Sequence, residues 1–201
     1  MKIGPKYKIA RRLGAAVFEK TQTPKFVLSA QKKKTKGFQK QRTGYAAQVL
    51  EKQKVRFTYF ISEKQLANYV KAAIFKNPSS AGPELFSSLE KRLDSVVLRS
   101  GFAKTRFASR QAVAHGHFMV NGRRSNVPSY QLKVGDVITI REGSKQKGLF
   151  AELEERLTES SSPTWLSVDK SKKSITLKGE PVYSAPESHF DINSVIQFYK
   201  R

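Results

Sequence analysis

The chain has 201 residues, and its 38 Lys and Arg residues far outnumber its 16 Asp and Glu residues, which gives a net charge of +22. Charge of one sign at this level opposes a compact fold unless an anionic partner neutralises it, and a polyphosphate is the obvious candidate. The absence of cysteine excludes disulfides and thiolate metal sites, and no apolar run approaches the ~20 residues that a membrane span requires.

The positive charge is concentrated near the start of the chain, where residues 1–60 carry 16 basic and 2 acidic side chains, a net charge of +14. The basic run at residues 31–37 lacks the apolar face with which a helix binds an anionic membrane surface, so RNA or DNA is favoured over a membrane. Residues 1–44 contain Gly and Pro and show no clear apolar period. They are therefore predicted to form an extended basic arm.

The next part of the chain, residues 45–75, has a helical pattern. Ser62 and Gln65 have the spacing of a capping box, and apolar residues follow Ser62 at helical spacing. Residues 77–83 are rich in Pro, Ser and Gly, which predicts a loop and the best candidate domain boundary.

Residues 84–100 are the most periodic segment, because apolar side chains recur there at steps of three and four: Leu85, Leu89, Leu93, Val96 and Val97. Gly101 is placed to end this helical segment, and Thr105 is placed to cap a second short helix. Asn121-Gly122 predicts a tight hairpin turn.

The remaining segments predict a strand at 137–140, a helix at 144–160, a hairpin formed by 165–168 and 174–177, and a final helix capped by Asp191.

Arginines in and beside the two short helices are the main candidates for binding. Arg92, Arg99, Arg106 and Arg110 are predicted to lie near one another, with Arg123 and Arg124 at the hairpin tip. The planar guanidinium bonds phosphate oxygens through two donors and stacks on bases. A shallow helix-and-strand module suits the backbone and shape of folded RNA, although a solvated helix face would have the same composition.

Other residues allow two interpretations. His115 and His117 could form a metal pair, but without cysteine or nearby carboxylates we favour packing or a hydrogen bond to RNA. Asp94 and Asp136 could be paired catalytic carboxylates, but we favour salt-bridge and turn-capping roles. Phe102 and Tyr130 could stack on bases, although core positions are favoured; three further residues are assigned to the core, Phe107, Phe118 and Met119.

The order of residues in the middle of the chain carries a family resemblance. The motifs are Leu89-Glu90, Arg92-Leu93-Asp94, Val96-Val97, Gly101-Phe102-Ala103, Thr105-Arg106, Arg110-Gln111, His115-Gly116-His117, Val120-Asn121-Gly122, Pro128-Ser129-Tyr130 and Gly135-Asp136. Together they resemble the alpha-L RNA-binding domain, which several families of RNA-binding proteins share.

Motifs on either side of this central region narrow the resemblance to one family. The motifs there are Gly4-Pro5-Lys6, Arg11-Arg12, Glu51-Lys52-Gln53-Lys54-Val55-Arg56, Pro163-Thr164-Trp165-Leu166 and Asp191-Ile192. They are similar to the family of the bacterial-type fourth protein of the small ribosomal subunit, and the resemblance covers nearly the whole chain.

The resemblance implies an α+β fold. A mostly helical domain (45–87, completed by 143–201) would hold an inserted alpha-L domain (88–142) with two helices and a small antiparallel sheet. The extended basic arm (1–44) would precede them.

The implied function is that of a structural constituent of the small subunit. Such a protein binds small-subunit ribosomal RNA at a helix junction of the 5′ domain and nucleates assembly. It neighbours the fifth small-subunit protein, helps line the messenger RNA entry path and supports translational accuracy. We expect no enzyme activity, cofactor, metal or membrane partner, and a cytoplasmic ribosome, with an organellar one left open.

The RNA-binding residues implied by the motifs are Lys6, Lys8, Arg11, Arg12, Lys52, Lys54, Arg56, Arg92, Arg99, Thr105, Arg106, Arg110, Gln111, His115, His117, Asn121, Arg123 and Arg124. Two other functions use the same domain. An RNA-modifying enzyme would need a catalytic fold for which the rest of the chain leaves no room, and a free-standing rescue or heat-shock RNA-binding factor would not explain the flanks.

Overall fold

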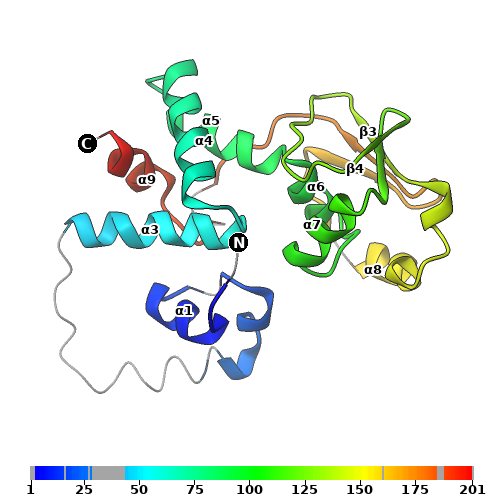
Figure 1. Ribbon diagram of the computed structural model, residues 1–201, viewed down its shortest axis with the longest axis horizontal. Coiled ribbons are helices and arrows are strands. Elements are labelled where there is room, and N and C mark those ends of the chain that lie inside the picture. Colours follow the sequence, from blue (N-terminus) through cyan, green and yellow to red (C-terminus); the bar gives the residue numbers. More distant parts are fainter. Residues whose placement is uncertain are drawn as a thin grey trace. The chain divides into compact units, whose positions relative to one another are not determined.

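The computed structural model describes residues 3–15, 17–26, 28, 44–159, 161–184 and 188–200 and is shown in Figure 1. The chain divides into two compact units. The first contains residues 1–85 and 183–201, and the second contains residues 86–182.

Three helices build most of the first unit: α3 (Gly44–Thr58), α4 (Glu63–Lys76) and α9 (Ile192–Tyr199). The capping box at the start of α4 is confirmed, because the Ser62 side chain accepts a hydrogen bond from the backbone of Gln65 and the Gln65 side chain bonds back to the Ser62 backbone. Asp191 caps α9 through the backbone N–H groups of its first turn, as the sequence predicted.

The N-terminal segment corrects the prediction of an extended arm. Residues Lys6–Leu13 form helix α1, and Glu19–Thr21 form the short 3-10 helix η1. Gly14, at φ +69°, ends α1 in the left-handed conformation that glycine adopts without strain. Apolar side chains that looked aperiodic in the sequence meet in a small core, Ala10, Leu13, Val17, Phe18 and Phe26, against which Leu50 and Phe57 of α3 pack. The basic run at 31–37 lies outside the described residues.

The second unit contains helices α6 (Leu93–Arg99) and α7 (Arg106–Ala114) and a five-stranded antiparallel sheet. Its strands are β1 (Phe118–Val120), β2 (Arg123–Ser125), β3 (Val137–Ile140), β4 (Leu166–Asp169) and β5 (Ser174–Leu177), in the order β2-β1-β3-β5-β4. One apolar core joins the helices to the sheet. The α+β fold class is therefore confirmed.

The structure divides the chain differently from the predicted domains. Residues 143–182 were assigned to the helical domain, but β5 pairs with β3 and extends the alpha-L sheet. Leu153 and Leu157 of α8 (Leu153–Glu159) lie in the same core. The predicted helix at 144–160 is shorter, since two 3-10 turns, η3 (Glu142–Ser144) and η4 (Gly148–Phe150), precede α8.

The periodic segment at 84–100 is two helices rather than one. Helix α5 (Ala81–Glu90) ends where Arg92 adopts an extended conformation and forms a β-bridge with Gln131. The unit boundary falls inside α5, not in the predicted loop at 77–83. Among the described residues, no helix has the length and apolarity needed to cross a membrane.

Candidate RNA interface

Helix α7 presents a polar, aromatic-bearing face to solvent. Thr105 caps the helix by accepting a hydrogen bond from the Ala108 N–H, 3.1 Å away. Ala112 and Val113 face the core, whereas Phe107 and Gln111 are exposed and Arg110 is partly exposed. Positions three and four apart share one face of a helix. The assignment of Phe107 to the core is wrong, because 55% of this residue is exposed, whereas Phe118 is buried as expected.

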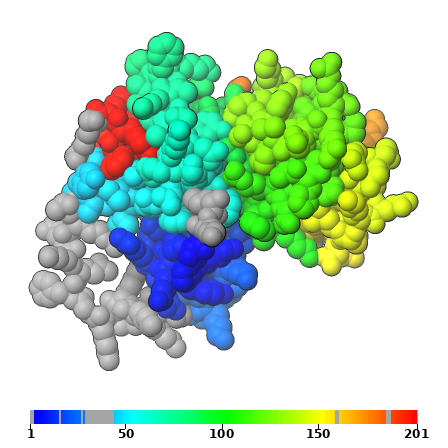
Figure 2. All heavy atoms as spheres, viewed as in Figure 1, coloured from blue at the N-terminus to red at the C-terminus, as the bar shows by residue number. Residues whose placement is uncertain are grey.

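The hairpin between β1 and β2 presents two arginines at a sheet edge. Asn121 and Gly122 both have positive φ, +48° and +78°, as the tight turn requires. The Asn121 side chain donates to Asp136 (2.8 Å) and accepts from the Val137 N–H (2.9 Å). It therefore fixes the turn against β3, which is the role that the structure gives to Asn121. In the space-filling view, the residues around 90–125, drawn in green, form a continuous part of the surface of this unit (Figure 2).

Arg124 connects the edge strand β2 to the end of α7. Its Nη2 donates to the carbonyl of His115 at 3.2 Å, a favourable place for a cation because a helix C-terminus carries partial negative charge. A Cβ on Gly116, which has φ +69°, would lie 2.3 Å from Nε of Arg124. A larger residue at position 116 would collide with the guanidinium, so glycine leaves the space that Arg124 occupies.

Arg92 is a structural residue, which corrects its prediction as an RNA contact. Its side chain and that of Asp94 are fully buried, and the guanidinium bonds both carboxylate oxygens, at 2.9 and 2.7 Å. Around this pair, the backbone of residues 93 and 94 donates to the carbonyls of Tyr130 and Pro128. The ion pair thus fixes the loop before β3 to the start of α6, in agreement with the salt-bridge role expected for Asp94.

Arg106 is corrected in the same way. It is 6% exposed, and its Nη1 donates to Ser95 Oγ at 2.9 Å. Ser95 in turn donates to the Leu89 carbonyl at 2.8 Å. This chain of hydrogen bonds connects the start of α7 to the end of α5, and it leaves Arg106 without the exposed surface that a phosphate contact needs.

Arg99 keeps exposed surface while it holds the fold. Its guanidinium bonds both carboxylate oxygens of Glu90, at 3.0 and 2.7 Å, and 43% of its side chain is exposed, against 1% for Glu90. Arg110 is more loosely placed, with Nη1 3.8 Å from Asp94 Oδ2. Both guanidinium groups can therefore face a ligand from the surface of the α6–α7 pair.

His117 is buried and hydrogen-bonded, whereas His115 is exposed. Nδ1 of His117 lies 2.9 Å from Ser144 Oγ. Burial lowers the pKa of His117, and the charges of Lys147, His115, Arg141 and Arg124 lower it further. Within the described part of the chain, no group of three or more His, Asp or Glu side chains could hold a metal ion.

Comparison with known proteins adds family evidence to this geometry. Residues 91–138 match the S4 domain, and residues 1–90 match the ribosomal protein S4/S9 N-terminal domain. Small ribosomal subunit protein uS4 of Azotobacter vinelandii is 38% identical, with 99% of this chain and 98% of that protein covered. The uS4 proteins of Sulfurihydrogenibium (40% identity, 98% and 95% covered) and Chlorobium limicola (35% identity, 96% and 96% covered) are also similar.

The chain belongs to the uS4 family of small ribosomal subunit proteins. Membership makes it a ribosomal protein that acts in the cytoplasmic ribosome, not an enzyme. The S4 domain implies binding to ribosomal RNA, and the subunit implies ribosomal proteins as neighbours. The family resemblance predicted from the sequence is confirmed.

The basic residues that the uS4 resemblance suggested in α3 are held in ion pairs. Lys52 lies 2.7 Å from Glu63, and Arg56 lies 3.5 Å from the other oxygen of the same carboxylate. Lys54 lies 2.6 Å from Glu51. Lys52 is also 9% exposed, so the structure gives it a packing role.

The uS4 resemblance also suggested four residues of α1. Lys8, Arg11 and Arg12 are exposed and Lys6 is partly exposed. The Lys6 ammonium lies 5.8 Å from the ring centre of Phe18, and the Arg11 guanidinium lies 5.8 Å from that of Phe26. The small N-terminal core thus supports a cluster of cations at the surface.

Sequence reasoning missed two basic residues of the second unit, Arg141 and Lys147. They lie in the segment after β3, outside every motif, and neither stands at helical spacing with the arginines of α6 and α7. The only signal in the sequence was the excess of basic over acidic residues at 141–147.

Proposed function

We propose that the chain binds a helix junction in the 5′ domain of small-subunit ribosomal RNA, mainly through the exposed face of α7 and the edge strand β2. The observation that carries the proposal is that some arginines are buried in the fold while others lie at the surface. Arg92 and Arg106 are buried in the fold, while Arg123 and Arg124 are exposed on β2 and Arg110 is partly exposed on α7. A rigid scaffold with guanidinium groups on its surface suits recognition of RNA by backbone and shape.

The N-terminal segment supplies a second basic surface through Lys8, Arg11 and Arg12, which are exposed on α1. Residues 1–60 hold a net charge of +14, so long-range attraction to RNA comes largely from this part of the chain. Attraction by the basic segment and positioning by the second unit together form the proposed mechanism of binding.

We further propose that the protein binds early and nucleates assembly of the subunit. At a net charge of +22, the anionic partner that neutralises the chain is RNA rather than another basic protein. Its proposed later position is beside the fifth small-subunit protein at the messenger RNA entry path. There, basic side chains would contact messenger RNA and support translational accuracy.

The binding test compares a double variant with a charge-matched control. Arg110→Ala with Arg123→Ala should weaken binding to a transcript of the 5′ domain. It should also reduce the dependence of log K on log salt by about 0.7–0.9 per lost phosphate contact. Lys172→Ala with Lys178→Ala removes the same charge beside β4 and β5, at the sheet edge opposite β2, and should change the slope less. Equal effects of the two double variants would contradict the proposed surface.

A further inference from the structure

Separate segments that carry basic residues meet at the end of α7. Arg124 comes from β2, His115 and His117 follow α7, Arg141 follows β3, and Lys147 precedes η4. Within the described residues, Arg124, Arg141 and Lys147 form no ion pair with a carboxylate. The nearest acidic residue in sequence, Glu142, is paired with Lys145 at 2.6 Å.

Backbone hydrogen bonds hold these segments together around His117. The Arg141 N–H donates to the His117 carbonyl at 2.9 Å, and the Lys147 N–H donates to the Ser144 carbonyl at 3.1 Å. The Ser144 hydroxyl also bonds the His117 ring. The ring centres of His115 and His117 are 5.9 Å apart, and the Phe150 ring lies edge-on to His117 at 6.2 Å. The turns at 141–150 are therefore folded against the imidazole.

The charged groups that lower the pKa of His117 are all basic. After burial, which acts first, the groups that lower the pKa of His117 are Lys147, His115, Arg141 and Arg124. Lys147 precedes η4, His115 follows α7, Arg141 follows β3, and Arg124 lies on β2. Such a concentration of like charge opposes folding unless an anion offsets it.

We propose that Arg124, Arg141, Lys147 and the His115 imidazole form a cradle for one backbone phosphate of the ribosomal RNA. This inference rests on the proposed function and extends the interface beyond α7 and the hairpin to the segment after β3. Arginine donors and a lysine ammonium bind phosphate oxygens through charge-assisted hydrogen bonds. The position of Arg124 over Gly116 orients one of these donors before RNA arrives.

A bound phosphate should also couple binding to protonation. Negative charge in the cradle offsets the cations around His117 and favours the imidazolium form of His117. RNA binding would then take up protons, and affinity should rise as the pH falls from about 8 to about 6, the range in which imidazole titrates.

The test compares two lysines of the same loop. Lys147→Ala removes a cradle residue, whereas Lys145→Ala removes the same charge from a side chain that is paired with Glu142. Binding to the 5′-domain transcript should weaken about tenfold in Lys147→Ala and about twofold or less in Lys145→Ala. Arg141→Gln should weaken binding as Lys147→Ala does. Unchanged thermal unfolding would show that each variant is folded.

Nuclear magnetic resonance of the imidazoles gives a second readout. RNA should shift the His115 and His117 signals in Lys145→Ala, and the shift should be smaller in Lys147→Ala. A similar loss of affinity in both lysine variants would overturn the cradle, yet the proposed function would stand if Arg110→Ala with Arg123→Ala still weakened binding. The cradle would also be overturned if a glutamate-rich peptide moved these signals and RNA did not, since the surface would then belong to a protein partner.

Discussion

At the scale of single residues, neighbouring arginines of one motif have different roles. Arg92 precedes α6 and Arg99 is its last residue, yet the first is fully buried against Asp94 and the second keeps 43% of its side chain exposed. The attraction between two buried charges stabilises the fold only by the amount that exceeds the cost of removing both charges from water. Its loss is severe when one partner is removed, because the other charge is then buried alone.

Replacing Arg92 is therefore expected to affect stability more than binding. Arg92→Ala leaves the Asp94 carboxylate buried without its main partner and should lower the free energy of unfolding by about 3–5 kcal/mol, measured by urea denaturation. Arg123→Ala, on the exposed edge strand, should change it by about 0.5 kcal/mol or less. A mild effect of Arg92→Ala would mean that water reaches Asp94.

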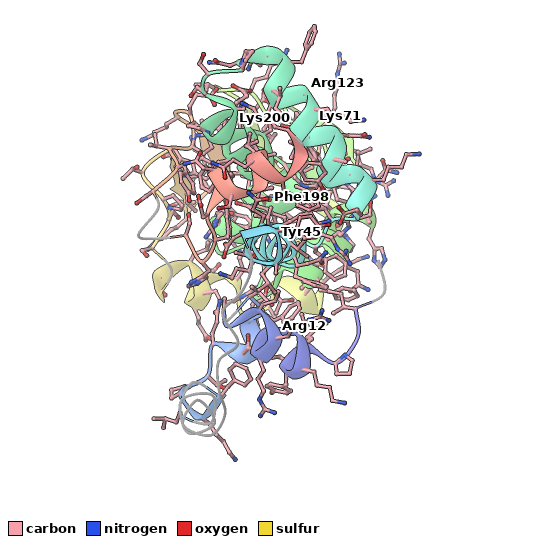
Figure 3. All side chains as sticks on the ribbon, turned by 90° about the vertical axis from the view of Figure 1, so that its left-hand side faces the viewer. Arg12, Tyr45, Lys71, Arg123, Phe198 and Lys200 are labelled. Carbon is pink, nitrogen blue, oxygen red and sulfur yellow. The ribbon has the colours of Figure 1, made fainter. Side chains whose placement is uncertain are left out.

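At the scale of elements, a network of side chains joins the last helix, α9, to α3 and α4. Tyr199 donates to Glu63 Oε1 at 2.8 Å, and Lys52 donates to the same oxygen at 2.7 Å. The Lys52 ammonium lies 4.3 Å from the ring centre of Phe198, whose ring is 5.8 Å from that of Tyr45; Figure 3 labels this aromatic pair. Burial, followed by the bond to Glu63, raises the pKa of Tyr199 well above its ordinary range.

This network predicts a pH dependence of stability. Burial raises the pKa of Glu63, but hydrogen bonds from Lys52 and Tyr199 and the charges of Lys52 and Arg56 outweigh it, so the pKa lies below its ordinary value of 4.5. The carboxylate therefore contributes stability that is fully present above pH 4.5 and is lost as the pH falls through its folded-state pKa.

The matching variant is Glu63→Gln, which cannot ionise. Its free energy of unfolding should be lower than that of the parent chain at pH 6, and the difference should shrink by pH 3. Urea titrations at both pH values measure it. A difference that stays constant over this range would show that the charge of Glu63 is not what stabilises α9.

At the scale of the whole molecule, the second unit has a core of its own, whereas the basic N-terminal segment belongs to the fold of the first unit. The second unit has its own apolar core, formed by α6, α7, α8 and the sheet. The N-terminal core packs against Leu50 and Phe57 of α3, so the basic segment is structurally part of the first unit. The N-terminal segment therefore contributes apolar residues to the fold of the first unit, and in the proposed mechanism its basic residues supply much of the attraction to RNA.

Deleting residues 1–43 should separate these roles. The truncated chain should bind the 5′-domain transcript more weakly and with a shallower salt dependence. Amide hydrogen exchange should accelerate in α3, because Leu50 and Phe57 lose their cover, and stay unchanged in β1, β3 and α7. Faster exchange throughout the second unit would show that its fold depends on the N-terminal segment.

Local patterns predicted much of this molecule. The capping box at Ser62, the Thr105 cap, the turn at Asn121-Gly122 and the buried Leu85, Leu89 and Leu93 were all predicted correctly, because each depends on residues a few positions apart. The N-terminal core was missed because Phe18 meets Phe57 of α3 and Phe26 meets Tyr7 of α1, at distances in sequence that periodicity does not detect.

The sequence by itself determined the α+β class, the uS4 family, the excess of positive charge and most element types, since composition, local spacing and motif order are properties of the chain alone. Only the tertiary structure decided which arginines hold the fold and which face solvent, that β4 and β5 join the alpha-L sheet, and that Arg141 and Lys147 lie with Arg124 around His117. The physical reason is that burial and ion pairing depend on contacts between distant segments, which a one-dimensional pattern does not contain.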